Sequence, residues 1–215
     1  MLSVRVKAAA GFTMIEAMVT LAIFAILVAI GVPTMSVWIR NNKVRSATDA
    51  LQNGLRLAQA ESLRRSRQVV FAFTNATPLT QLTPLPLPAA AGGTSWVIYT
   101  IPSMTDNSEA PIYIQSGDFS NATANVQVTG PVAVCFNSVG RLTSNATTVT
   151  AITGGANSCI QPTLPAAAGL PPAYKFGISI PGADRPLQVN LGLGGQVHMC
   201  DPAVTISDSH PEGCP

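Results

Sequence analysis

The hydrophobic pattern of the chain begins with one long uncharged stretch. Residues 17–39 form a run of 23 without a formal charge, which is long enough for a helix to cross a hydrocarbon core of about 30 Å. An ordinary secretory signal has a shorter apolar stretch, with its small residues after it and not before it. We therefore expect a single-pass membrane anchor. Its orientation stays open, because basic residues flank it on both sides.

Helical periodicity continues beyond the anchor as far as Arg67. Apolar residues at i, i+3 and i+4 spacing predict that one side of this segment covers a globular head. That stripe comprises Val44, Ala47, Leu51, Leu55, Ala58 and Ser62, and another face carries Asn53, Arg56, Ala60, Arg64 and Arg67. Anchor and continuation together predict one helix over residues 12–67. Three arginines at positions 64, 65 and 67 suit the negative C-terminal end of a helix, although such a cluster can also bind phosphate.

From Gln68 onward the pattern changes to short β-branched and aromatic runs separated by turn residues. The predicted strands cover residues 68–74, 96–101, 111–114, 126–128, 132–137, 147–152, 174–179, 187–190 and 196–200. Residues 75–95 contain four prolines and a Gly-Gly pair, which predict a long surface loop. Gly192, Gly194 and Gly195 predict a tight turn before the last strand. The fold class is therefore α+β, with a long N-terminal helix packed on an antiparallel β-sheet head.

Composition and charge exclude several classes of function. Charged residues make up 10% of the chain, against about 25% in a typical soluble domain. Residues 68–215 carry three cations and seven acids, which disfavours a nucleic-acid-binding globule. The two histidines both lie near the C-terminus, and no nucleophile elbow or close acid pair is present. We expect no enzyme activity, no cofactor and no metal, and we interpret His198 as a strand residue.

The four cysteines predict disulfides when the head lies on the side of the membrane away from the reducing cytoplasm. Three pairings are possible. Pairing of nearest neighbours predicts Cys135–Cys159 and Cys200–Cys214, and the second bond would hold a tail with little apolar content. A metal site has only weak support, since no CxxC pair occurs and oxidation competes; its ligands would be His198, Cys200, His210 and Cys214.

One acid lies at the entrance of the apolar run. An ionised carboxylate in lipid costs on the order of a few kcal/mol unless it is paired or interfacial, and Glu16 could simply be an interfacial acid that favours the helix dipole. Its surroundings favour another interpretation. Lys7-Ala-Ala-Ala-Gly11 followed by Phe12-Thr-Met-Ile-Glu16 resembles the class III signal of type IV pilins and type II secretion pseudopilins.

The resemblance implies a role for each residue of this signal. In that family a prepilin peptidase cuts after the glycine, and the new N-terminal phenylalanine is usually N-methylated. By analogy residues 1–11 are a leader, Gly11 and Phe12 flank the cleaved bond, and Phe12 is methylated. Glu16, fifth in the mature chain, would register an incoming subunit against its neighbour. Cleavage removes two cations, so the mature chain has 10 cations and 10 anions.

The helix and the head carry further points of resemblance. Proline is common in pilins at the depth of Pro33, where together with Gly31 it would kink the helix; a tolerated transmembrane proline is an equal alternative. In the head, Val69-Val-Phe-Ala-Phe, Cys135-Phe-Asn-Ser-Val-Gly-Arg141 and Val197-His-Met-Cys200-Asp-Pro202 resemble the FimT/FimU and GspH group of minor pilins and pseudopilins. The implied domains are an anchor at 12–39, an amphipathic continuation at 40–67 and a periplasmic head at 68–215.

The group implies a low-abundance subunit that primes pilus assembly and sits at or near the filament tip. The implied partners are prepilin peptidase, other minor pilins, the major pilin and the inner-membrane assembly platform. The implied location is the bacterial inner membrane and then the filament at the cell surface.

Two alternatives use related motifs. One is a GspH-like pseudopilin of a type II secretion system, although the long Pro/Gly-rich insert favours a pilus. The other is a FimT-like DNA receptor with a Gly-Arg-x-Arg pattern. Here Gly140-Arg141-Leu142-Thr143 has the first arginine and lacks the second. Arg141 is thus the candidate DNA contact, and nucleic acid is disfavoured as the principal ligand.

Overall fold

The computed structural model describes residues 11–75, 90–101, 110–119, 125–143 and 173–215, without the side chain of Pro33. Its one helix in this part of the chain is α1 (Met14–Arg65), and nine strands follow it. The predicted α+β class is confirmed, and the helix is two residues shorter at each end than predicted. The chain forms two compact units, which meet in sequence between Ile39 and Arg40.

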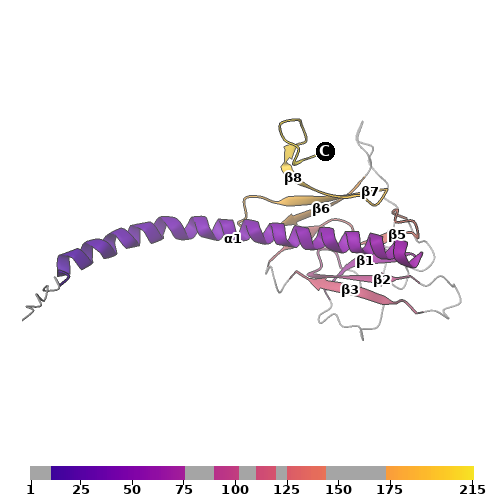
Figure 1. The fold of residues 1–215 in the computed structure, drawn as a ribbon, viewed down its shortest axis with the longest axis horizontal. Helices are drawn as coiled ribbons and strands as arrows, with labels where there is room; N and C mark the ends of the chain where they lie inside the picture. Colours follow the sequence, from indigo (N-terminus) through magenta and orange to yellow (C-terminus); the bar gives the residue numbers. More distant parts are fainter. Residues whose placement is uncertain (1–10, 76–89, 102–109, 120–124, 144–172) are drawn as a thin grey trace, which may run out of the picture. The chain divides into compact units, whose positions relative to one another are not determined.

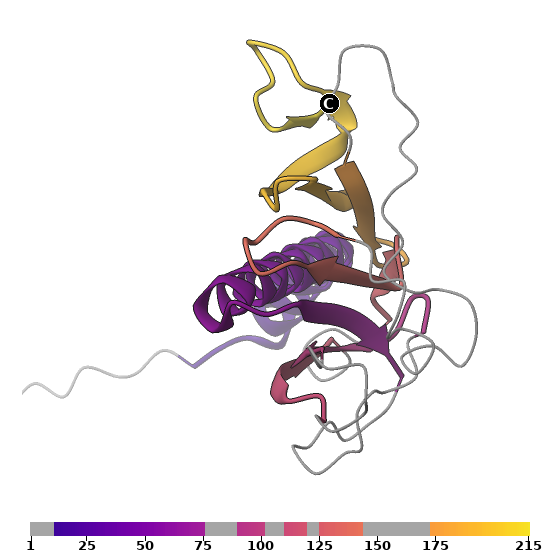
Figure 2. The same ribbon diagram turned by 90° about the vertical axis from the view of Figure 1, so that its right-hand side faces the viewer.

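The strands of the second unit form two sheets (Figures 1 and 2). The first sheet has the order β3-β2-β1-β5 and the second β4-β6-β7-β8-β9. All neighbours are antiparallel except β8 and β9. The bounds are β1 (Val69–Thr74), β2 (Ser95–Thr100), β3 (Tyr113–Asp118), β4 (Gln127–Thr129), β5 (Ala133–Phe136), β6 (Ala173–Ser179), β7 (Leu187–Gly192), β8 (Val197–Thr205) and β9 (Gly213–Cys214).

The predicted apolar stripe of α1 is the side that the sheets cover. All six residues of the stripe are at most 3% exposed, from Val44 to Ser62. The five apolar residues of the stripe share one cluster with side chains of both sheets, among them Phe71, Phe136 and Phe176. Burial of a large apolar side chain stabilises a fold by about 1.5–3 kcal/mol. Every buried core residue of the described chain lies at position 44 or later, so the second unit, residues 40–215, carries a core of its own. From here on the word head means this unit, that is, the predicted head at 68–215 together with the helical continuation at 40–67.

Several strand bounds differ from the prediction. The strand expected at 111–114 lies at Tyr113–Asp118, where it pairs with β2 and has a register shift between Ile98 and Tyr99. β8 runs past Cys200 and through Pro202 to Thr205. Proline is tolerated there because β7 pairs only with residues 197–200 of β8. The short β9 was not predicted, and the strand expected at 147–152 lies outside the described residues.

Two glycines make room for an aromatic stack between α1 and the first sheet. The rings of Phe71 and Trp96 are stacked, with centroids 5.5 Å apart. On α1, a Cβ at Gly54 would lie 2.9 Å from Phe71 Cε2 and 3.3 Å from Trp96 Cζ2. On β3, Gly117 lies opposite Trp96, and a Cβ there would lie 2.5 Å from the indole ring. The absence of a side chain at both positions therefore allows the helix and β3 to approach the stack closely.

The first sheet is buried on both faces at its centre. All residues of β1 and β2 are buried. Those pointing away from α1 form a second apolar cluster, which includes Val70, Val97, Tyr99 and Cys135. The Tyr99 hydroxyl has no hydrogen-bond partner among the described residues, and burial raises its pKa well above the ordinary value.

Candidate functional site

The predicted cleavage point lies immediately before the start of α1. Thr13 caps the helix: its carbonyl accepts the Ala17 N–H at 3.2 Å, and its Oγ1 accepts the Glu16 N–H at 3.3 Å. Gly11 and Phe12 are not helical and are exposed. The Gly11–Phe12 peptide bond thus lies in a non-helical, exposed segment, which a peptidase can reach.

Thr13 is a functional residue that the sequence interpretation missed. Thr13-Met-Ile-Glu16 has the Thr-x-x-Glu spacing of a capping box, in which a threonine side chain and a glutamate three residues later mark a helix start. That local signal could have placed the helix start at Met14. It also positions Glu16 in the first turn of α1, where the helix dipole favours a carboxylate.

Glu16 stands among exposed apolar side chains. Phe12, Ile15 and Val19 are 79%, 72% and 52% exposed. Apart from the half-buried Val37, the described apolar side chains of α1 remain exposed as far as Ile39. Among the described residues, α1 is the one helix long and apolar enough to cross a membrane. No bond from the Glu16 carboxylate to another described residue is present. Within the part of the chain that the structure describes, the carboxylate is therefore open to a partner.

α1 is continuous through Gly31 and Pro33. Proline has no N–H, so one carbonyl of the preceding turn loses its helical donor. The hydroxyl of Thr34 donates to the carbonyl oxygens of Gly31 at 2.8 Å and Ile30 at 3.4 Å, which adds side-chain bonds to the same stretch. A Cβ at Gly31 would meet nothing within 4 Å. The kink assigned to Gly31 and Pro33 stays a prediction.

The arginines at the end of α1 are partly neutralised within the helix. Arg64 and Arg65 each place a guanidinium nitrogen 2.7 Å from Glu61 Oε2. Hydrogen bonding from Arg64 above all, and also from Arg65, lowers the pKa of Glu61 from 4.5 to about 2. Two of the three cations thus have an anionic partner in the same turn, which favours the helix-end interpretation over a phosphate site.

Gln59 joins the two sheets to α1, another role that the sequence did not indicate. Its Nε2 donates to the carbonyl oxygens of Gly140 at 3.0 Å and Gly194 at 3.5 Å. Gly140 lies in the loop after β5, and Gly194 lies in the loop between β7 and β8. A backbone hydrogen bond also joins these two loops, because the Leu142 N–H donates to the Leu193 carbonyl oxygen at 3.0 Å. The glycine turn predicted before the last strand is present, because the Gly195 N–H donates to the Gly192 carbonyl at 2.8 Å.

Arg141, the candidate DNA contact, lies in a compact loop after β5. The side-chain oxygen of Asn137 accepts its N–H at 2.9 Å and that of Val139 at 3.1 Å. Gly140 provides the left-handed turn with φ 73°. The Arg141 side chain is exposed, but the nearest exposed neighbour in sequence is the apolar Val139 and not a second cation. The described loop therefore offers one isolated charge to a phosphate backbone.

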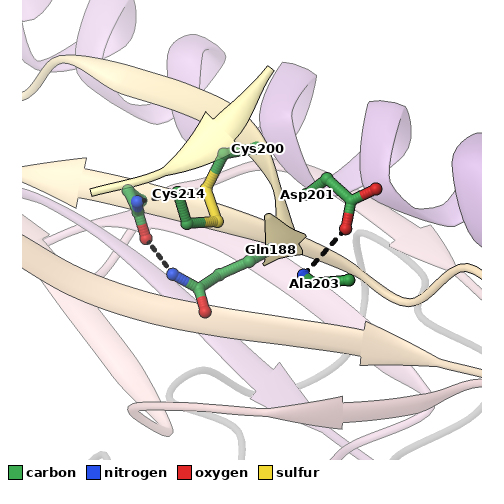
Figure 3. The surroundings of a disulfide bond; sticks show 6 residues. Gln188, Cys200, Asp201, Ala203 and Cys214 are labelled. Atoms are coloured by element: carbon green, nitrogen blue, oxygen red, sulfur yellow. Dashed lines mark hydrogen bonds between the residues drawn. A yellow bond between two sulfur atoms is a disulfide. The ribbon is translucent and has the colours of Figure 1, made fainter. Parts of the chain in front are cut away.

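The predicted bond between Cys200 and Cys214 is present and links β8 to β9 (Figure 3). Asn190 on β7 donates to Cys200 Sγ at 3.3 Å and accepts a 2.6 Å bond from Gln188. Both sulfurs of the alternative metal site are thus used in the disulfide, so neither is a thiolate ligand. Of the other predicted pair, Cys135 is buried in β5 and Cys159 lies outside the described residues.

The comparisons with known proteins agree with this arrangement. A model of the prokaryotic N-terminal methylation motif matches residues 6–32, which include the predicted cleavage point and Glu16. This motif, the apolar helix and the β-sheet head define the class of type IV pilin-like proteins. The model of the family described as type II transport protein GspH matches residues 47–163. The chain belongs to this family, whose members are structural subunits of the minor pilin and pseudopilin kind.

Solved structures with distant sequences were also found. The type IV minor pilin FimU of Pseudomonas aeruginosa PAO1 aligns with a TM-score of 0.45 at 14% identity, over 75% of this chain and 93% of that one. The minor pseudopilin EpsH of the Vibrio cholerae type 2 secretion system aligns with a TM-score of 0.44 at 8% identity, over 75% and 99%. A search of curated proteins gave no match.

Proposed function

We propose that this chain is a minor type IV pilin that prepilin peptidase cleaves between Gly11 and Phe12 and that then primes pilus assembly at or near the filament tip. The observation that carries the proposal is the accessible Gly11–Phe12 bond directly before a capped helix whose first part, up to Ile39, exposes most of its apolar side chains. The anchor would hold the subunit in the inner membrane, with the head in the periplasm, until it is extracted into the filament. Other pilins and the assembly platform are the partners this role requires.

Cleavage would also supply a positively charged partner for Glu16. Hydrolysis of the Gly11–Phe12 bond creates an amino group at Phe12, four residues before the carboxylate. A carboxylate in lipid costs on the order of a few kcal/mol unless it is paired, and N-methylation of that amine leaves it able to carry a positive charge. The amine of an incoming or neighbouring subunit is thus a suitable partner for Glu16, which would set the depth at which the subunit enters the filament.

The test separates processing from assembly. Gly11→Leu should leave the leader attached, because a large side chain stands at the cleaved bond, and the uncut chain is detected by its mass. Glu16→Ala should be cut normally but be depleted from sheared filaments, whereas Glu16→Asp keeps the charge and should be incorporated better than Glu16→Ala. If Glu16→Ala subunits enter filaments as often as the unchanged chain, the registry role is wrong.

A second candidate is a pseudopilin of a type II secretion system, which the description of the matching family favours. The two functions use the same processing and the same anchor, so the variants above do not separate them. Deletion of the gene distinguishes the pilin from the pseudopilin. Loss of surface pili with normal protein secretion supports the pilin, and the reverse supports the pseudopilin.

A further inference from the structure

The head begins directly where the uncharged run of the anchor ends. The run covers residues 17–39, and the head begins at Arg40. Trp38 is 65% exposed, and tryptophan is enriched where the hydrocarbon of a membrane meets water. The layer of lipid headgroups on each side of a hydrocarbon core is about 5–8 Å thick. When the anchor spans a membrane, roughly the first four or five residues of the head therefore lie within that layer.

Three cations of α1 lie at this level, namely Arg40, Lys43 and Arg45. Arg40 and Arg45 are exposed, and Lys43 is half-buried. The Cα–Cβ bonds of a helix tilt towards its N-terminus, which here is the direction of the anchor. Lys43 and Arg45 lie about 6 and 9 Å beyond Ile39 along the helix axis. Their long side chains can therefore place the charged ends in the headgroup layer.

A loop of the second sheet is held against the same turn of α1. This loop joins β6 to β7. The side-chain oxygen of Asn41 accepts the N–H groups of Asp184 at 3.0 Å and of Arg185 at 3.3 Å. Arg40 Nη1 donates to the Gly182 carbonyl oxygen at 3.3 Å. Tertiary packing thus brings Arg185, which is distant in the sequence, to the first turn of the head.

The sequence of the loop determines its shape. The Ala183 N–H donates to the Ile180 carbonyl oxygen at 3.0 Å and closes a tight turn. Its two central residues are Pro181 and Gly182, and Gly182 has a φ of +79°, a combination that a type II turn favours. A Cβ at Gly182 would also collide with Arg40 Nη1. Glycine is therefore needed both for the turn and for the close approach of the loop to α1.

The helix and the loop together form a ring of cations at the start of the head. We call this ring the basic collar and define it by Arg40, Lys43, Arg45 and Arg185. Residues 40–46 and 180–186 contain these four cations and one acid, Asp184. No acid in the described part of the chain forms an ion pair with any of the four. Arg40 uses one of its five N–H donors on the loop and keeps its charge.

The positions of these cations fit a bilayer better than a single folded partner. At about 100° per residue, Arg40, Lys43 and Arg45 are spread around α1 and do not share one face. They could not all meet one flat protein surface, but headgroups surround a membrane helix on every side, so each cation can meet a different lipid. Anionic headgroups attract Lys and Arg residues that lie next to a membrane span.

We propose that the basic collar binds the phosphate groups of anionic phospholipids in the leaflet next to the head. The site rests on the membrane anchor of the proposed function and deepens it, because the collar would hold the head at one depth until the subunit is extracted. Each basic residue near an anionic surface adds about fivefold to the attraction. The single contacts are thus weak and screened by salt, so the collar can release the membrane when the subunit leaves it.

The test identifies the lipids next to the collar. The full mature chain, with a benzophenone side chain in place of Ile39, is placed in vesicles of equal parts phosphatidylglycerol and phosphatidylcholine with the same acyl chains. Illumination joins the probe to its neighbours, and mass spectrometry gives the ratio of anionic to neutral lipid adducts. Phosphatidylglycerol should be in excess by about threefold or more. Equal amounts of the two adducts, or adducts to protein alone, would overturn the proposal.

Two substitutions in the loop should change this ratio in opposite directions. Arg185→Gln removes the cation that only the folded head brings to the collar, and should lower the excess about twofold or more. Asp184→Asn removes the acid beside it and should raise the excess. Both variants keep the backbone N–H groups that Asn41 accepts, so the loop stays in place. An unchanged ratio in Arg185→Gln, or a fall in Asp184→Asn, would refute the site.

Arg141→Gln is the matched control, because it makes the same change in another exposed arginine. The loop of Arg141 is bonded to α1 through Gln59 and the Gly140 carbonyl. The stretch of α1 from Arg40 to Gln59 is about 28 Å long, which is more than three Debye lengths at physiological salt. The lipid ratio should therefore not change. A loss as large as that of Arg185→Gln would show that only total charge matters and would overturn the proposal.

Inorganic phosphate separates a lipid site from a site for soluble anions. The lipid ratio should be the same in phosphate and in chloride at equal ionic strength. A fall that is specific to phosphate would assign the collar to soluble anions and overturn the lipid proposal. Leader removal and the Glu16 requirement are measured independently in cells, so a failure of the collar is distinguishable from a failure of the pilin assignment.

Discussion

Gly117→Ala should destabilise the head through a single methyl group. The added Cβ would lie 2.5 Å from Cε2 and Cζ2 of Trp96 and 2.7 Å from Nε1, whereas ordinary carbon contacts lie at about 3.5–4.0 Å. The indole must therefore move by roughly 1 Å. It has little room to do so, because Trp96 is only 6% exposed and its ring is stacked on Phe71, with Gly54 of α1 also close by.

The size of the effect follows from two opposing contributions. Overpacking a core costs about 1–3 kcal/mol, and alanine recovers roughly 0.5–1 kcal/mol of the backbone entropy that glycine loses in a strand. The net loss should be about 1–2 kcal/mol. In a domain of this size 1 kcal/mol shifts Tm by about 2–4 °C, so Tm should fall by about 2–8 °C.

Thermal unfolding of the head measures this change directly. Residues 40–215 contain a single tryptophan, Trp96, so its fluorescence reports both the shift in Tm and the altered ring environment. Gly192→Ala is the matched control, since its Cβ would lie 3.2 Å from only the flexible end of Gln196. An equal Tm for Gly117→Ala and the unchanged head, with the same Trp96 emission, would refute the close-packing argument.

Three further outcomes are expected. The pKa of Glu61 is about 2 in the folded head, against 4.5 for an unperturbed carboxyl, so the stability that its ion pairs contribute is present above pH 4.5 and is lost as the pH falls towards 2. Because Arg64 is 63% exposed, Glu61→Gln should lower the free energy of unfolding in urea by only about 1 kcal/mol or less at pH 7. The same substitution should reduce the dependence of stability on pH below 4.5. Replacing both Cys200 and Cys214 by serine removes a closed loop of sequence separation 14, so unfolding should become easier by about 3 kcal/mol, and proteases should cut after β8 first. Gln59→Ala removes a donor shared by two loops and should cost about 0.5–1.5 kcal/mol, seen as faster hydrogen exchange in both loops and not in β1.

Local features of the sequence predicted much of the fold. The stripe from Val44 to Ser62 and the run from Val69 to Thr74 have periods that belong to single elements, so neighbouring residues determine them. The bounds of β3 and β8 could not be obtained in this way. Pairing with β2 determines the bounds of β3. β8 continues through Pro202 because it pairs with β9 beyond Cys200, where its pairing with β7 stops.

The residues proposed for processing and registry were predicted from the sequence alone, because the N-terminal methylation motif is a short contiguous segment and a membrane anchor is defined by its length and polarity. Gly11, Phe12 and Glu16 needed no tertiary contact to be found. By contrast, Gly117 beside Trp96 and Gln59 between two loops bring together residues that are 20 or more positions apart. Only the paired strands and the packed helix create those neighbours, and therefore only the tertiary structure decided how the core of the head is packed and which loops Gln59 joins.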